Sequence, residues 1–297
     1  MVIIMWLLMA ILTLVFWGFA DLFYKKGNRE EDKYSHIKTG IMVGMVMGLH
    51  AFIYSLVKGL SFSFNDFVKY LPVSLCYIIS MIIGYKGLKY INLSVSSPIQ
   101  NSSGLITSIL LCIIFKVELS LLEIIGLSII AIGVWILSYI ENKTNKKMIL
   151  KNLKLTAIIF PLLYCLIDGA GTFLDAIYLD FNEIISEDMA LISYESTFFI
   201  YGLISLIYLC FIKHEKINVF NEKNKLFAAI IETFGQFTYV FAISSFSYIT
   251  APIVACYSAF SVFLSRIFLK EKLNKWQYLA LFFIFLGIIL IAIFEEI

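Results

Sequence analysis

A series of apolar segments, each about 20 residues long, limits this chain more than any other feature of its sequence. Of the 297 residues, 61% are hydrophobic and only 15% are charged, which excludes an ordinary water-soluble domain. A helix needs roughly 20 apolar residues to cross about 30 Å of hydrocarbon. We count ten such segments, near residues 2–25, 37–57, 68–90, 94–115, 121–139, 153–179, 188–212, 224–247, 250–269 and 274–294.

These segments are expected to be helices. Lipid offers no hydrogen bonds to bare backbone groups, so only helices and closed barrels can span a membrane. Barrel strands alternate between apolar and polar residues, and these segments do not alternate. The sequence therefore predicts an all-α integral membrane protein with about ten transmembrane helices.

Lysine and arginine are distributed unequally between the two alternating sets of loops. The loops after the first, third, fifth, seventh and ninth segments, with the adjoining helix ends, hold all basic residues except Lys58, Lys69 and Lys116. Short loops rich in lysine and arginine stay in the cytoplasm. We therefore expect a multi-pass protein of a bacterial plasma membrane with both termini outside, together with the acidic loop at 180–188.

A polar connector, "ENKTNKKMILKNLK" at 141–154, divides the ten segments into two sets of five. A shift of 154 positions places Asp21 on Asp175 and Pro98 on Pro252. Because five is odd, the second set enters the membrane upside down relative to the first. Inverted repeats of this kind are typical of secondary transporters, whose substrate site lies near the midplane between repeats. The sequence predicts two inverted five-helix repeats, 1–145 and 146–297, in a single membrane domain.

Short motifs add to this plan. They are Trp17-Gly18 in the first segment, Pro98, Glu118, Gly126 and Gly133-Val134 at the end of the first half, and Pro252, Glu271 and Gly287-Ile288 at the end of the second. With these motifs in this order, the chain resembles the EamA family of the drug/metabolite transporter superfamily over essentially its whole length. The resemblance implies a secondary transporter of small metabolites that works by alternating access without ATP.

Five carboxylates fall inside apolar segments: Asp21, Asp168, Asp175, Glu195 and Glu232. An ionisable side chain there costs on the order of 2.5–3.5 kcal/mol and usually faces a cavity, a partner or a pathway. Asp168 lies roughly 21 Å of helix beyond the polar connector and is therefore deep in the membrane. We predict all five as proton-coupling or gate residues. For Glu195, near a predicted helix start, solvation at the membrane interface is the alternative. For Asp21, four residues before Lys25, the alternative is contact with interface water or a pair with that lysine.

Asp168 and Asp175 share one helical face with Tyr164. Gly169 and Gly171 between them permit a local break or a close helix contact. We predict that Asp168 binds substrate or a proton and that Asp175 lies on the path to it. The alternative is a packing face of small residues, in which both acids bond to neighbouring hydroxyl groups.

Further polar and aromatic residues are predicted to line a cavity. Glu232, Gln236 and Tyr239 follow i, i+4, i+7 spacing and form one polar stripe on an apolar helix. Trp17 lies one turn from Asp21, an arrangement that can hold an organic cation by cation–π attraction; core packing is the alternative. The predicted substrate-binding residues are Trp17, Gln100, Asn101, Tyr164, Asp168, Glu232, Gln236, Tyr239 and Tyr257.

Prolines and glycines predict helix starts and helix contacts. Pro98 and Pro252 are expected in the first turns of two helices, where proline loses no hydrogen bond. Gly40, Gly44 and Gly48 form a small-residue stripe that predicts close contact with another helix.

Motifs for several other functions are absent. The sequence has no G-x-x-x-x-G-K-[ST] and no paired Cys/His set, so we expect no ATP hydrolysis, metal or cofactor. We attribute the basic loops to membrane orientation and expect no nucleic-acid partner.

Deep acids outnumber deep bases, so we predict a cationic, zwitterionic or amine substrate. A carboxyl group removed from water holds its proton more readily, so exchange of a proton for substrate at Asp168 or Glu232 is a further hypothesis. The alternatives are a lipid-handling membrane protein and, less favoured, an intramembrane enzyme. The expected partners are a small-molecule substrate and the bilayer; a homodimer is compatible, but a monomer is sufficient.

Overall fold

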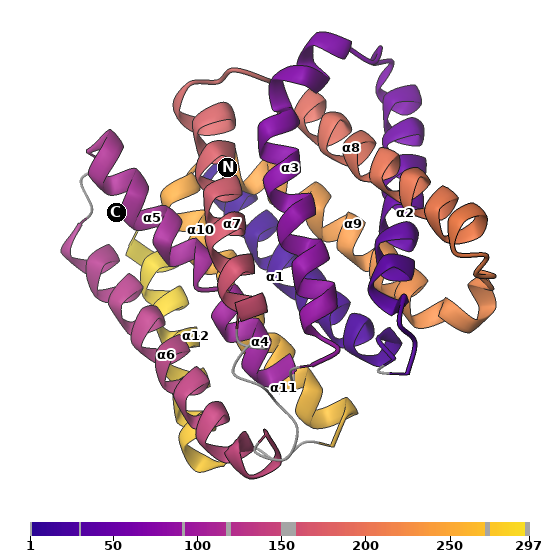
Figure 1. Ribbon diagram of the computed structural model, residues 1–297. Coiled ribbons are helices and arrows are strands. Elements are labelled where there is room, and N and C mark those ends of the chain that lie inside the picture. Colours follow the sequence, from indigo (N-terminus) through magenta and orange to yellow (C-terminus); the bar gives the residue numbers. More distant parts are fainter. Residues whose placement is uncertain are drawn as a thin grey trace.

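The computed structural model describes residues 2–29, 31–90, 93–116, 120–149, 159–270 and 274–294, and every regular element among them is a helix. The helices pack into one bundle (Figure 1). They are α1 (Val2–Gly27), α2 (Ser35–Lys58), α3 (Phe64–Gly87), α4 (Leu93–Gln100), α5 (Ser103–Phe115), α6 (Leu121–Ile149), α7 (Ile159–Ala176), η2 (Ile177–Phe181), α8 (Glu187–Ile207), η3 (Tyr208–Ile212), η4 (Val219–Glu222), α9 (Lys223–Ile243), α10 (Ser247–Ala255), α11 (Tyr257–Phe268) and α12 (Lys275–Phe294).

Seven helical stretches in the described part of the chain are long and apolar enough to cross a membrane. They are α1, α2, α3, α7 with η2, α8 with η3, η4 with α9, and α10 with α11. Shorter apolar stretches lie at 106–115 and 124–133. A multi-pass membrane protein is therefore confirmed, whereas the predicted number of ten spanning helices is not.

Two of the predicted helices are each divided in two. Segment 94–115 forms α4 and α5, and segment 250–269 forms α10 and α11. Pro98 and Pro252 are each the sixth residue of the first short helix, so the prediction that they lie in first turns is wrong. Proline has no N–H for the helical bond and its ring crowds the preceding turn. Each short helix ends within three residues of its proline, and the chain begins a new helix at Ser103 or Tyr257.

The two halves of the chain interlock. α1 packs along α9 and α3 along α7, while α2 packs along α8 and α6 along α12. The shift of 154 positions carries α1 onto α7 and α3 onto α9, so α1–α9 and α3–α7 are equivalent contacts with the halves exchanged. Two related repeats around a pseudo-twofold axis produce this pairing. The interior of the bundle is therefore the junction between the repeats.

The glycine stripe of α2 lies against α8. A methyl group on Gly44 would stand 2.3 Å from the backbone oxygen of Phe198 and 2.9 Å from the Cα atom of Gly202. At Gly40 and Gly48 a methyl group would overlap aromatic rings of α8. The predicted close helix contact is confirmed, because larger residues would force the two backbones apart.

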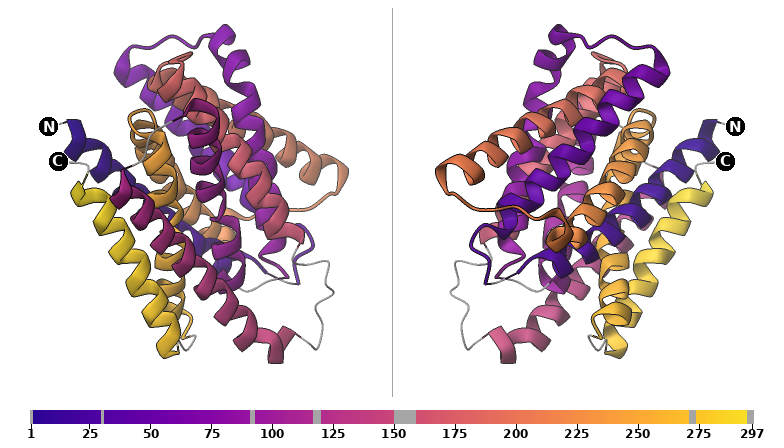
Figure 2. Two further views of the ribbon diagram at one scale, coloured as in Figure 1. Left: turned by 90° about the vertical axis from the view of Figure 1, so that its left-hand side faces the viewer. Right: turned by 90° about the vertical axis from the view of Figure 1, so that its right-hand side faces the viewer.

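Both termini lie at one end of the bundle, which we call the terminal end (Figure 2). The opposite end, which we call the basic end, carries the loops after α1 and α3. Lysines tie these loops together: Lys25 Nζ donates to the backbone oxygen of Leu88 (2.9 Å), and Lys89 Nζ to that of Asp32 (2.7 Å). Lys38 also pairs with the Asp32 carboxylate at 2.8 Å. That the basic end faces the cytoplasm stays a prediction.

Candidate functional site

A pocket lies at the junction of the two halves. Its wall comes from α1, α3, α7, α8 and α9 and from the two helix breaks, α4–α5 and α10–α11. All nine predicted substrate-binding residues line it, namely Trp17, Gln100, Asn101, Tyr164, Asp168, Glu232, Gln236, Tyr239 and Tyr257. Their binding roles stay predictions.

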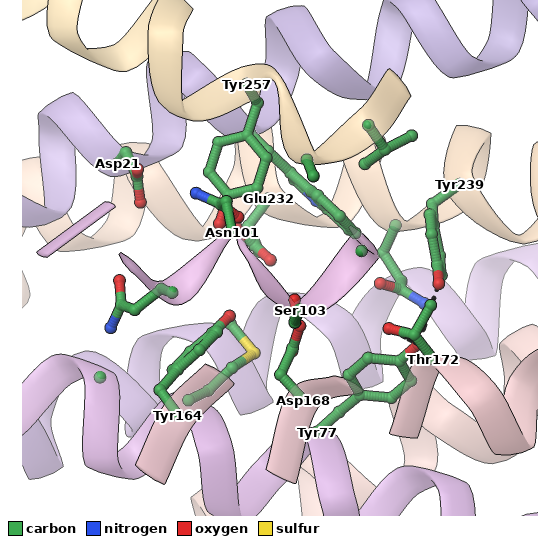
Figure 3. A pocket seen from close by; sticks show the side chains of 18 of the residues that line it. Asp21, Tyr77, Asn101, Ser103, Tyr164, Asp168, Thr172, Glu232, Tyr239 and Tyr257 are labelled. Carbon is green, nitrogen blue, oxygen red and sulfur yellow. Dashed lines mark hydrogen bonds between the residues drawn. The ribbon is translucent and has the colours of Figure 1, made fainter. Parts of the chain in front are cut away.

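Three carboxylates, those of Asp21, Asp168 and Glu232, lie in this pocket (Figure 3). Serine hydroxyls hold two of them. Asp168 accepts a hydrogen bond from Ser103 Oγ at 2.8 Å, beside the α4–α5 break. Asp21 accepts from Ser97 Oγ at 2.8 Å and from Ser261 Oγ at 3.0 Å. These bonds fit the alternative in which the acids pair with hydroxyls, although both carboxylates also line the pocket.

The third carboxylate, Glu232, differs from the other two in having no hydroxyl partner among the described residues. Its side chain is buried, with 8% of the residue exposed. No hydrogen bond or ion pair joins it to another residue in the described part of the chain, and the charges of Asp21 and Asp168 repel its own. None of the described residues that line the pocket is lysine, arginine or histidine. A buried carboxylate without a partner is unfavourable, so the site lacks a positive group.

Aromatic rings and two unpaired donors form another part of the wall. The ring of Trp17 lies 5.0 Å from that of Tyr239 and 5.7 Å from that of Tyr257, between ring centres. Trp17 Nε1 and Gln236 Nε2 are buried, and neither finds an acceptor among the described residues. A buried donor without an acceptor costs about 1–3 kcal/mol. Both donors therefore favour a ligand that brings an acceptor.

Asp175 does not line the pocket but lies one turn beyond it, toward the terminal end. It is fully buried and accepts hydrogen bonds from the hydroxyls of Tyr70 and Tyr77. The Tyr77 hydroxyl also shares a 2.9 Å hydrogen bond with that of Tyr239. We call these four residues the tyrosine latch. The latch joins α3, α7 and α9 at the floor of the pocket, and its role as a gate stays a prediction.

Glu195 lies outside the pocket, between α2 and α8. The alternative of interface solvation is wrong, because Glu195 is fully buried. His50 Nδ1 on α2 lies 2.8 Å from both of its carboxylate oxygens. The pair connects two packed helices and does not face the other acids.

Sequence reasoning missed several tyrosines of the site. Tyr70 and Tyr77 are seven residues apart and therefore share one helical face, a signal that would have found them. Tyr85, which lines the pocket, matches Tyr239 under the shift of 154 positions. Tyr24 and Tyr194 also line the pocket. Tyr24 matches Tyr178 under the same shift, whereas Tyr194 stands in no sequence pattern that distinguishes it from an ordinary core tyrosine.

Two interlocked helical repeats with a pocket at their junction are the plan of membrane transporters of the inverted-repeat class. The chain belongs to the EamA-like transporter family, whose model matches residues 4–139 and 156–293. A crystal structure with 10% sequence identity aligns with a TM-score of 0.72 over 98% of this chain and 97% of its own, which shows a shared fold. No curated protein matches the sequence significantly.

Proposed function

We propose that this protein is a secondary transporter that carries a small cationic, zwitterionic or amine substrate by alternating access. The observation that carries the proposal is the pocket between the repeats, where Asp21, Asp168 and Glu232 converge without a basic residue among the described lining. A positive group on the substrate would supply the partner that Glu232 lacks. Charges in low dielectric interact strongly, so this pairing would dominate recognition.

The position of the pocket suggests how access alternates. Its lining includes Leu88 and Tyr85, near the end of α3 at the basic end, whereas the tyrosine latch lies between the pocket and the terminal end. In this conformation the pocket is closer to the basic end. Passage to the terminal end would require α3 and α7 to separate, which breaks the bonds to Asp175.

A proton could take the place of the substrate in the opposite half of the cycle. Three carboxylates in one pocket repel one another, so an empty pocket favours protonation of at least one of them. Binding of an ammonium group would favour release of that proton. Asp168 and Glu232 are the residues that we propose for this exchange.

Flux in proteoliposomes tests the proposal. We expect a pH gradient to drive accumulation of a labelled amine, and Glu232→Gln to reduce amine flux by at least about tenfold, since a charged pair is lost. Asp168→Asn is expected to retain flux but to lose its dependence on the gradient. Glu183→Gln, which changes an exposed acid, is the matched control.

Three results would contradict parts of this proposal. Flux that ignores the gradient in the unmodified protein would remove proton coupling. Unchanged amine flux in Glu232→Gln would remove Glu232 from the site. Transfer of labelled lipids between leaflets, without amine flux, would favour the lipid-handling alternative.

A further inference from the structure

The pocket contains a hydrogen-bond acceptor and a hydrogen-bond donor that both lack partners, and they lie close together on one helix. Glu232 is an acceptor without a donor, and Gln236 Nε2 is a donor without an acceptor among the described residues. Both side chains are more than nine-tenths buried, with 8% and 2% of each residue exposed. They are four residues apart, roughly 6 Å along α9. One small molecule can therefore reach both.

Trp17 adds a second donor at the same place. Its Nε1 atom is buried without an acceptor in the described part of the chain. A Cβ atom on Gly235 would lie 2.5 Å from this nitrogen, so the indole rests directly on α9 beside Gln236. Both N–H donors therefore belong to pocket-lining residues at the same turn of α9. An unpaired donor there is costly, so a ligand acceptor would be favoured.

The charge of the pocket decides which acceptor fits. Trp17 and Gln236 are neutral, and the described lining contains no lysine, arginine or histidine that would balance a carboxylate. Glu232 lies one turn away, with Asp21 and Asp168 in the same pocket. A carboxylate at this point would face three acids and receive only neutral donors. A hydroxyl or carbonyl oxygen would accept the same hydrogen bonds without that repulsion.

From this arrangement, and resting on the proposed function, we infer that the substrate is an organic cation with a neutral hydrogen-bond acceptor beside its ammonium group, such as an amino alcohol or amino amide. The ammonium group pairs with Glu232, and the acceptor receives hydrogen bonds from Trp17 and Gln236. The rings of Trp17, Tyr239 and Tyr257 contact the apolar part and the cation. A zwitterion with a free carboxylate is discriminated against.

Ligands that differ only in the group beside the ammonium test the need for an acceptor and the exclusion of a carboxylate separately. L-phenylalaninol carries an ammonium group and a hydroxyl, phenethylamine lacks the hydroxyl, and L-phenylalanine carries a carboxylate in its place. L-leucinol, isoamylamine and L-leucine repeat the comparison with an aliphatic body. Binding to the full chain in detergent is measured by competition and by the shift of the thermal unfolding midpoint.

We expect the amino alcohol to bind at least about tenfold more tightly than the amino acid on one scaffold or both, because like charges in the pocket repel the carboxylate. It should bind about fivefold more tightly than the simple amine through the added hydrogen bonds. Trp17→Phe keeps an aromatic ring but removes the donor, so it should abolish this second difference, while binding of the simple amine should weaken only as far as phenylalanine is the poorer cation–π partner. Trp135→Phe, on the exposed face of α6, is the matched control.

Gln236→Leu removes the other donor and keeps the test decisive if Trp17→Phe fails to fold. Equal binding of the amino acid and the amino alcohol, or an unchanged preference in a folded donor variant, would overturn the inference while leaving the proposed function standing. Failure of every amine to bind would overturn both. Loss of amine binding in Glu232→Gln, with no preference for an acceptor, would support the proposed function alone.

Discussion

The buried carboxylates differ in their hydrogen-bond partners, and this difference decides which of them is available to a ligand. Asp21 and Asp168 accept hydrogen bonds from serines, Asp175 from tyrosines, and Glu195 lies against His50. Glu232 has no such bond in the described part of the chain. Bonds to protein hydroxyls compete with a ligand, so Glu232 is the carboxylate most available to one.

At the residue scale, the tyrosine latch can be tested by removing one hydroxyl. Tyr70→Phe keeps the ring but removes a hydrogen bond to Asp175. A hydrogen bond to a charged group is worth about 1.5–3 kcal/mol, so opening at the terminal end should become about tenfold more frequent or greater. The measurement is the rate at which an impermeant maleimide, added from the terminal end, labels Ala251→Cys in the pocket.

The background for this labelling lacks the native cysteines. Tyr139→Phe, an exposed tyrosine on α6, is the matched control and should not change the rate. An unchanged rate in Tyr70→Phe would show that the latch does not limit access.

Residue identities alone predicted the pocket lining well, because a polar side chain in an apolar helix has few favourable places to face. They placed Asp175 on the path to Asp168 and left Glu195 out of the substrate-binding residues, but they did not predict what encloses either acid. Asp168 and Asp175 lie seven residues apart on one face, yet only Asp168 lines the pocket, since tyrosines of α3 enclose Asp175. Spacing along a helix specifies the face but not what the neighbouring helix places against it.

At the scale of elements, the contact between α2 and α8 depends on the absence of side chains. The backbones approach so closely at Gly44 that a methyl group would overlap the backbone of α8. The His50–Glu195 pair lies further along the same two helices. Packing and polar contacts therefore both hold α2 to α8.

Gly44→Ala should destabilise the protein by roughly 1–3 kcal/mol, because overpacking forces the helices apart. The free energy of unfolding in detergent is the measurement. Gly169→Ala is the matched control: the nearest atom to its added methyl lies at 3.5 Å, an ordinary contact. If the two variants unfolded alike, the close contact of α2 with α8 would not contribute to stability.

The sequence analysis did not predict the two helix breaks, α4–α5 and α10–α11. The prolines at 98 and 252 were recognised in sequence, but each was placed at a helix start because proline is tolerated there. In the structure each lies near the end of a short helix, and the following residues enter the pocket wall. Proline at either place fits local rules; packing of the neighbouring helices decides between them.

At the scale of the whole molecule, the two ends of the bundle differ in charge, and this difference predicts orientation. Ser61 lies in the loop after α2 at the terminal end, and Val219 begins η4 at the basic end. In intact cells, an impermeant maleimide should label Ser61→Cys and not Val219→Cys, because basic loops stay in the cytoplasm. After the membrane is permeabilised, both should react. The reverse pattern would overturn the predicted orientation.

The sequence by itself determined that this chain is an α-helical membrane protein of two repeats, because lipid requires long apolar helices and a repeat leaves its spacing in the residues. It also placed carboxylates inside the membrane. Only the tertiary structure decided that Asp21, Asp168 and Glu232 share one pocket while Asp175 and Glu195 are enclosed elsewhere. The physical reason is that the rotation and depth of each helix follow from its packing against a helix of the other repeat, α1 on α9 and α3 on α7.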